Sequence, residues 1–467
     1  MHAAALILTI LFSLWLVVRD CRKRRSVSAA VWIPIALLLI LGSRPVSLWM
    51  TGGQVVVNEM GNEVATSPYD QIFHLLILTS SVAIATARHF KWTKLLSGNK
   101  ALVLFYLFFF ASVLWSGDPE GSLKRVIKDS GLLYVGALLF TERDPLLSIR
   151  SVYFRCAAIL IPVSVVFIKF FPDYARAYTV AGEIMVTGVT TQKNSLGEIV
   201  LIFTLMLLWD SAESMRQGSR LYWKRMPWDR LILIAMGMWL LYESQSKTAL
   251  LCIIVGSTLL LRIGKFASRA ANRLVLTSAL ALPFLILFSQ RFSSVIAPVV
   301  EALGRNMTFT GRTDIWQHIT LKTVNPLIGA GFWNFWGGPG GYAISLEMHT
   351  PVPNAHCGYY DMYIDGGFIG IALLFSLLLF SGLYICRQME KKTADADRFH
   401  RIRLAFLVVA IIYNLSETTW GRIGPMWLTT LLMIVEYPRP LRPVTVRARA
   451  SNRPEVFATP EEVCAHL

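Results

Sequence analysis

Long apolar runs recur along this chain, and they constrain its fold more than any other feature. A helix that spans a membrane needs about 20 mainly apolar residues. Several of the runs are short for a full span, so the sequence predicts an all-α, polytopic transmembrane helix bundle of about 11–13 spans. The predicted spans are 2–18, 29–50, 71–87, 101–116, 130–140, 151–168, 194–209, 229–244, 248–262, 274–290, 366–386, 404–416 and 425–436.

Composition agrees with a fold built in lipid. Only 16% of the residues are charged, whereas a soluble domain carries about a quarter. The net charge of +16 would raise nucleic acid as a partner for a soluble protein. Here the basic residues stand in short runs between apolar stretches, which is typical of cytoplasmic loops. We therefore expect membrane lipids as partners and no nucleic acid.

The distribution of Lys and Arg predicts which loops face the cytoplasm. With the N-terminus outside, the inner segments hold 31 of the 45 Lys and Arg residues. Those inner segments are 19–28, 88–100, 141–150, 210–230, 262–273, 387–403 and the tail from 437. The first apolar run precedes its basic cluster at 19–25, which suits a retained helix better than a signal peptide.

This orientation divides the chain into four parts. Residues 1–290 form a transmembrane helix bundle, and 291–365 form one long periplasmic loop that we expect to carry the active site, since long loops of this kind are usually functional. Residues 366–436 supply the C-terminal transmembrane helices. The Pro- and Arg-rich segment 437–467 is predicted to be a disordered cytoplasmic tail.

The first motif of the long loop is TGRTDIW. A helix starting at Thr313 or Asp314 would place Arg312, Trp316 and Ile319 on one face. Arg312 could bind a phosphate bidentately, or it could simply be solvated at the headgroup boundary.

The second motif, NPLIGAGFWNFWGG, carries a cluster of aromatic side chains. Trp333, Phe335 and Trp336 could stack on sugar rings, or they could form an interfacial belt.

The third motif, NAHCGYYDMYIDGG, leads into a predicted span. His356 is a side chain that can take a proton near neutral pH, and Asn354 could orient a ligand. If 356–365 is helical, His356, Tyr360 and Tyr363 share a face. The alternative is a structural histidine at a helix entrance.

Cations also occur at other predicted outer positions. Lys193 and Asn194 lie in TTQKNSLG, Lys247 lies in ESQSKTAL, and Arg176 lies in an outer segment. A cation so close to hydrocarbon is costly unless it has a partner, although snorkelling to the interface also explains it.

These segments together resemble the O-antigen ligase and polysaccharide polymerase superfamily. The resemblance depends on their order: QKNSLG, SQSK, GRTDIW, NPLIGAGF and NAHCGYYDMYIDGGFIG. It covers residues 100–435 loosely and 188–372 more closely. SRPVSLW and SGDPEGSLKR also resemble the exopolysaccharide-production branch of that superfamily.

The resemblance implies a reaction and a location. Family members act on the periplasmic face of the bacterial inner membrane, on a glycan linked to a polyprenyl diphosphate. Ligases pass the glycan to a lipid A core, and polymerases pass it to another lipid-linked repeat unit. The family is regarded as metal-independent, and no cofactor is expected. We favour the polymerase, with the ligase as the alternative. A polysaccharide transporter or flippase is disfavoured because no inverted repeat is evident.

The resemblance also implies roles for particular residues. His356 and Arg312 match the family's loop histidine and arginine, which makes them the candidate catalytic residues. Lys247 stands where many relatives have arginine, and Cys357 replaces a frequent asparagine. The other candidates for binding the diphosphate and substrate are Lys193, Asn194, Asn354 and Arg176.

Overall fold

The computed structural model describes residues 2–51, 67–178, 182, 184–216, 226–261, 268–287, 312–321, 324–390 and 394–438. Apart from a two-stranded antiparallel hairpin of β1 (Arg176–Tyr178) and β2 (Ile184–Val186), its regular structure is helical. The α-helices are α1 His2–Lys23, α2 Trp32–Leu41, α3 Val46–Met50, α4 Pro68–Ala87, α5 Trp92–Gly98, α6 Lys100–Ala111, α7 Pro119–Phe140, α8 Pro145–Phe170, α9 Pro172–Ala175, α10 Lys193–Arg216, α11 Trp228–Ser244, α12 Lys247–Leu261, α13 Arg269–Leu287, α15 Arg312–Leu321, α16 Pro339–Glu347, α17 Gly358–Met389, α18 Ala394–Tyr413 and α19 Pro425–Ile434. Two 3-10 turns, η1 Ala29–Val31 and η2 Ser112–Trp115, complete the set.

The predicted all-α polytopic bundle is confirmed, and a helix covers at least part of each predicted apolar span. Within the described ranges, α1, α4, α8, α10 and α17 are long and apolar enough to cross a membrane alone. The pair α5 and α6 would make a sixth span, bent by 95° at its break. The other predicted spans lie on helices that are shorter or less apolar. Helix α7 has 22 residues but is not apolar enough to cross alone, and α19, with 10 residues, is about 15 Å long.

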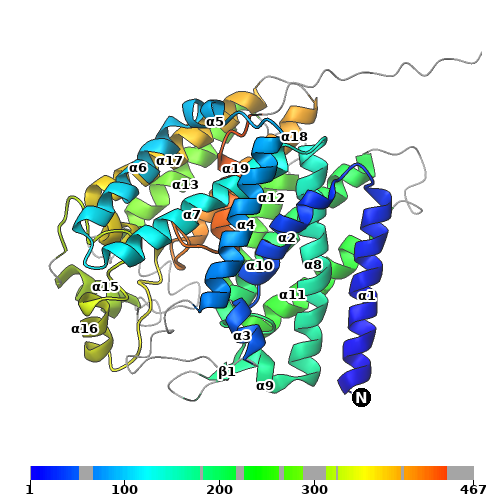
Figure 1. Cartoon of the computed structure of the whole chain (residues 1–467), viewed down its shortest axis with the longest axis horizontal. Helices are drawn as coiled ribbons and strands as arrows, with labels where there is room; N and C mark the ends of the chain where they lie inside the picture. The colour runs from blue at the N-terminus through cyan, green and yellow to red at the C-terminus, as the bar shows by residue number, and fades with distance from the viewer. Residues whose placement is uncertain are drawn as a thin grey trace, which may run out of the picture.

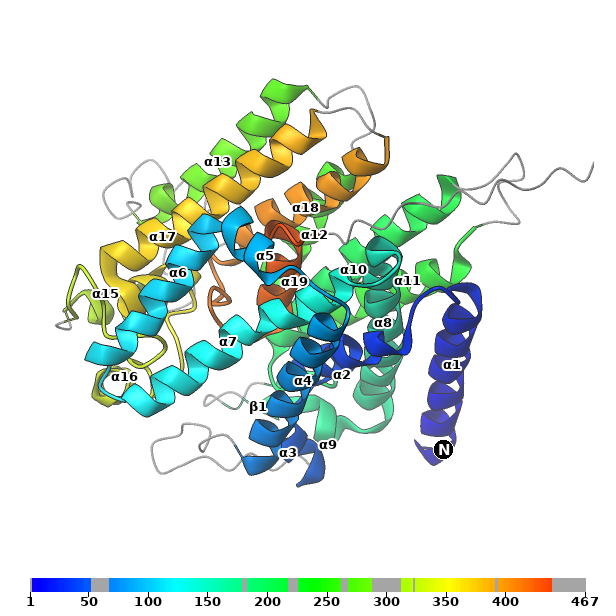
Figure 2. The same cartoon turned by 45° about the horizontal axis from the view of Figure 1, so that its top comes forward.

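Helices α8 and α10 form the centre of the bundle, and α1 and α4 lie at its surface (Figures 1 and 2). In both central helices 78% of the most apolar window is buried, against 22% in α1 and α4. Helix α10 packs against α8, α11, α12 and α19, whereas α1 packs mainly along α8. Exposed leucines on α1, such as Leu8 and Leu11, are explained by contact with lipid.

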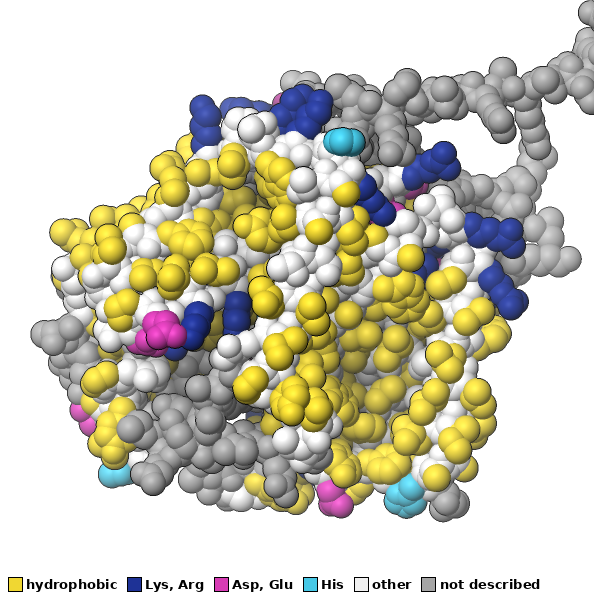
Figure 3. Space-filling view, viewed as in Figure 1, with side chains coloured by type: hydrophobic (Ala, Val, Ile, Leu, Met, Phe, Trp, Pro, Cys, Tyr) yellow, Lys and Arg dark blue, Asp and Glu magenta, His cyan; other side chains and the backbone are white. Residues whose placement is uncertain are grey.

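The segments predicted to face the cytoplasm meet at one end of the bundle. Arg24, after α1, binds Asp210 near the end of α10, and Ser28 binds Glu142 after α7. Phe140 stacks on Tyr437 at the far end of the chain. Lys and Arg side chains gather along the top and upper right of Figure 3, where α1 and α4 end, above a mainly apolar surface.

Candidate functional site

The loop between α18 and α19 organises the opposite end of the bundle. We call residues 414–424 the α18–α19 loop. The buried side chain of Asn414 accepts hydrogen bonds from the backbone N–H groups of Thr419 (2.9 Å) and Trp420 (3.1 Å). Its Nδ2 donates to Thr419 Oγ1 at 2.7 Å. The Asn414 side chain thus fixes the turn. The residues between Asn414 and Thr419 can therefore hydrogen-bond to neighbouring helices.

This loop contacts the first turns of three helices. Glu417 Oε1 accepts a hydrogen bond from Asn194 Nδ2 on α10 at 3.0 Å. The carbonyl of Glu417 accepts one from the N–H of Gly358, where α17 begins, also at 3.0 Å. Ser416 Oγ lies 2.7 Å from Thr248 Oγ1 on α12. The segments QKNSLG, ESQSKTAL and NAHCG, far apart in sequence, therefore meet here.

The loop histidine lies just before α17. The N–H of His356 donates to Asn354 Oδ1 at 2.9 Å, and His356 adopts a left-handed backbone with φ 49°. Because α17 begins only at Gly358, the expectation that His356 shares a helical face with Tyr360 and Tyr363 is wrong. Asn354 holds the bend that presents His356.

Helix α15 docks on the same segment. Trp316 Nε1 donates to the carbonyl of Ala355 at 2.9 Å, and the Trp316 ring stacks on Tyr360 with centroids 5.0 Å apart. Both Trp316 and Ile319 are buried. The helix begins at Arg312, whose side chain lies outside the described part of the structure. Its backbone is one turn from Trp316, about 6 Å along the helix axis.

The second loop motif packs against a break in α17. The helix is interrupted at Gly367, with φ 60° and ψ −157°. The N–H groups of Ala330 and Gly331 donate to the carbonyls of Ile364 (2.8 Å) and Asp365 (3.0 Å). A Cβ at Gly329 would lie 2.4 Å from the backbone of Asp365, so the close approach requires glycine.

The aromatic residues of that motif are structural. Phe335 and Trp336 are buried, at 7% and 4% exposure, and Trp336 Nε1 donates to the buried Asp361 carboxylate. They therefore form neither a sugar platform nor an interfacial belt. Trp333 is half-buried, and the guanidinium carbon of Arg422 lies 5.0 Å from its ring centroid.

Arg422 is a buried cation that sequence reasoning missed. It donates to Asp365 Oδ2 at 2.6 Å. Burial lowers the pKa of Arg422, but the carboxylates of Asp365 and Asp361 outweigh this effect and hold the pKa above its usual value. The available signal was a polar interruption, SETTWGRIGP, between two apolar runs on the predicted outer side.

The segment SGDPEGSLKR also joins this end of the molecule. Ser122 Oγ donates to the carbonyl of Phe332, and Arg125 Nη1 donates to that of Trp333, each at 3.0 Å. The start of α7 is thereby tied to the NPLIGAGF motif.

The structure brings Asn194 and the segment of Asn354 and His356 to the α18–α19 loop. Lys193 is half-buried where α10 begins, and Lys247 is exposed where α12 begins. Arg176 is exposed on β1, and no described contact joins it to the α18–α19 loop. Among the described residues, no group of three or more His, Cys, Asp or Glu could hold a metal ion.

Fold and site define a multi-pass membrane protein with a polar site at one end of a helix bundle. The family model described as O-Antigen ligase matches residues 231–375. The exopolysaccharide production protein ExoQ of Rhizobium meliloti (strain 1021) is 23% identical over 336 residues, covering 68% of this chain and 72% of ExoQ. These matches confirm the resemblance to the O-antigen ligase superfamily and its exopolysaccharide-production branch. The chain is therefore similar to membrane proteins that ligate or polymerise polysaccharides.

Proposed function

We propose that this protein is a glycan transferase of the bacterial inner membrane that polymerises exopolysaccharide or O-antigen repeat units on the periplasmic face. The donor is a glycan linked to a polyprenyl diphosphate, and the acceptor is a second lipid-linked glycan. The observation that carries the proposal is the meeting of Asn194, Thr248 and the segment 354–358 on the α18–α19 loop. Three motifs of the superfamily thus contribute to one site.

The reaction forms one glycosidic C–O bond, breaks one C–O bond to the diphosphate and transfers one proton. An acceptor hydroxyl oxygen attacks the anomeric carbon of the donor glycan, and the bond from that carbon to the diphosphate oxygen breaks. The diphosphate leaves with the bonding electrons. His356 accepts the hydroxyl proton as general base.

We infer that the positive charges of the site stabilise the diphosphate leaving group. Negative charge grows on the diphosphate as its bond to the sugar breaks, and preorganised cations stabilise it. We assign this role to Arg312 first, with Lys247 and Lys193 where α12 and α10 begin. Asn194 and Asn354 orient polar groups, and Arg176 extends the cationic surface.

Backbone geometry supports the same location. The described chain has five non-glycine residues with positive φ, and three of them lie in these motifs: Gln245 at 54°, Trp333 at 48° and His356 at 49°. Such conformations cost free energy and tend to occur where a site requires them.

The test measures polymer formation by the reconstituted protein when it is supplied with a polyprenyl-diphosphate-linked glycan. His356→Ala should abolish polymer formation while membrane insertion is retained, and Arg312→Ala should do the same. His349→Ala is the matched control, because His349 lies in the same loop region, is exposed and has φ 50°. Full activity of His356→Ala would remove this residue from the mechanism.

A ligase acting on lipid A core is the second candidate, supported by the match to the O-antigen ligase model. A deletion strain separates the two functions. Loss of polymer with single repeat units retained indicates a polymerase, and polymer retained on its lipid carrier indicates a ligase.

A further inference from the structure

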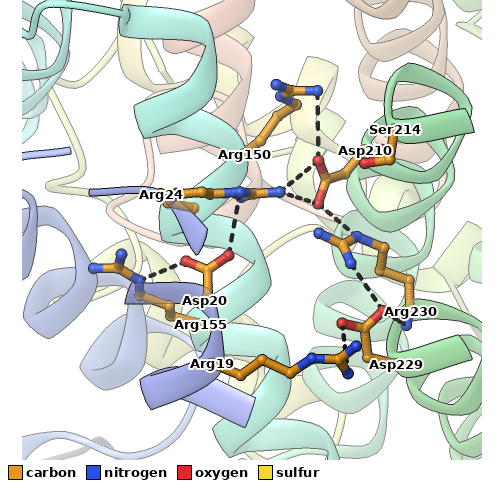
Figure 4. A network of polar contacts seen from close by, with 10 residues as sticks. Arg19, Asp20, Arg24, Arg150, Arg155, Asp210, Ser214, Asp229 and Arg230 are labelled. Carbon is orange, nitrogen blue, oxygen red and sulfur yellow. Dashed lines mark hydrogen bonds and ion pairs between the residues drawn. The ribbon is translucent and has the colours of Figure 1, made fainter. Parts of the chain in front are cut away.

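The end of the bundle away from the candidate site holds a buried network of ion pairs (Figure 4). We call it the arginine cluster. Arg24 Nη2 lies 2.6 Å from Asp210 Oδ2, and Arg230 Nε lies 2.8 Å from the same oxygen. Its members, contributed by α1, α8, α10, α11 and the turn after α1, are Arg19, Asp20, Arg24, Arg150, Arg155, Asp210, Asp229 and Arg230.

Cations outnumber carboxylates in this cluster by five to three. The side chains of Arg24, Arg150, Arg155 and Arg230 are each less than a tenth exposed. Two carboxylates outside the cluster, Glu213 and Asp144, also act on Arg150, and Asp144 does so while it caps the N-terminus of α8. Burying charge away from water is costly unless counter-charge is supplied.

Arg150 is the least satisfied member. Its contact with Asp210 is 3.6 Å, longer than the other contacts of that carboxylate. Its Nε is buried and has no hydrogen-bond partner in the described structure. The Arg19 side chain is 41% exposed, and its Nη1 makes a longer contact of 3.4 Å with Asp229 Oδ2. Guanidinium donors are thus left over for an anion.

The surroundings of the cluster indicate the source of that anion. Exposed tryptophans lie beside it: Arg19 stands over Trp15 at 5.2 Å, Arg155 stands over Trp32 at 5.5 Å, and Trp228 precedes Asp229. Tryptophan prefers the headgroup level of a membrane. From this level the exposed apolar side chains of α1 extend toward its N-terminus.

We propose that the arginine cluster binds the phosphate headgroup of an acidic phospholipid whose acyl chains lie along α1. Guanidinium groups match phosphate oxygens bidentately, and basic pockets between transmembrane helices suit such headgroups. The lipid supplies the missing negative charge and completes the attachment of α1 to the bundle. This binding is separate from glycan transfer and does not depend on the proposed function.

The test uses the full chain in nanodiscs of phosphatidylcholine, with and without phosphatidylglycerol. Phosphatidylglycerol should raise the melting temperature of the wild type and bind it selectively in native mass spectrometry. Arg150→Gln should weaken that binding about tenfold, the loss expected for one charged hydrogen bond. Arg19→Gln should act in the same direction, and it keeps every ion pair in which both side chains are buried.

Lys94→Gln is the matched control, because Lys94 is an exposed cation on α5 at the same end of the bundle. It removes one charge and should leave phosphatidylglycerol binding unchanged. An equal loss in Lys94→Gln and Arg19→Gln would overturn the proposal, since it would show only general attraction to an acidic surface. Equal melting temperatures of the wild type in both lipids would also overturn it. Stabilisation by inorganic phosphate alone would reject a lipid site in favour of a free-anion site.

Discussion

The two ends of α10 carry opposite kinds of polar structure. Near its start, Asn194 binds Glu417 through one hydrogen bond, and Glu198 accepts the backbone N–H of Met426 at 2.9 Å. Near its end, Asp210 is held by Arg24, Arg150 and Arg230. Asn194 and Asp210 are sixteen residues apart, about 24 Å along one helix.

The two ends therefore differ in their expected roles, one in glycan transfer and the other in stability. At the first end, one ion pair, Arg422–Asp365, is buried, but the α18–α19 loop is joined to the helix starts by single hydrogen bonds, which are worth only about 0.5–1.5 kcal/mol each. At the second end, several charges are buried together, so the loss of one leaves others uncompensated. We therefore expect changes at the first end to affect transfer first, and changes at the second to affect stability first.

The largest expected effect comes from Asp210→Ala. It leaves three buried arginines without their shared carboxylate, and we expect a loss of about 3–5 kcal/mol in the free energy of unfolding. Denaturation in detergent measures this, and transfer per folded molecule should be retained. Asp173→Ala, an exposed carboxylate on α9, should stay within about 0.5 kcal/mol. An unchanged unfolding midpoint for Asp210→Ala would show that the buried ion pairs do not stabilise this end of the bundle.

Gly358→Ala should have the second largest effect on stability. The added Cβ would lie 2.1 Å from Asn414 Oδ1, so the α18–α19 loop has to move. Overpacking of this kind costs about 1–3 kcal/mol, and transfer should fall sharply because the His356 segment is displaced. At Gly98 a Cβ meets nothing within 4 Å, so Gly98→Ala is the control. Equal activity of the two variants would contradict a functional role for this contact.

Asn194→Asp should change stability less than either of these substitutions. It replaces the hydrogen bond to Glu417 by two facing carboxylates, at a cost of about 1–2 kcal/mol. We expect transfer to fall more than stability, measured by polymer formation and thermal unfolding on the same preparation. Asn194→Ala removes the bond without the repulsion and should be milder. If the two variants behave alike, the charge of Glu417 does not face position 194.

The smallest effect is expected for Lys124→Gln. Lys124 pairs with Glu120 on the surface of α7, where both side chains are more than half exposed. Surface pairs of this kind contribute about 0–1 kcal/mol, so the melting temperature should barely change. A large shift would mean that charge alone, and not burial, distinguishes the polar regions of this protein.

Periodicity and hydropathy predicted the helices well and the details of the site less well. Apolar runs identified the helices because lipid-facing and core helices both require them, and the Lys and Arg counts grouped the loops at each end. The prediction that the aromatic motif stacks on sugar rings or forms an interfacial belt was wrong for Phe335 and Trp336, because both side chains are buried. Arg422 was missed because its importance comes from Asp365, 57 residues away in sequence.

The amino-acid sequence was enough to predict an all-α membrane bundle, the division of its loops into two groups and the order of the motifs. These depend on local composition and on the free energy of placing side chains in lipid. The folded arrangement was needed to see that one loop, 414–424, joins the starts of α10, α12 and α17. It was also needed to see that several buried arginines share carboxylates at the other end. Both depend on contacts between residues distant in sequence, which no local pattern specifies.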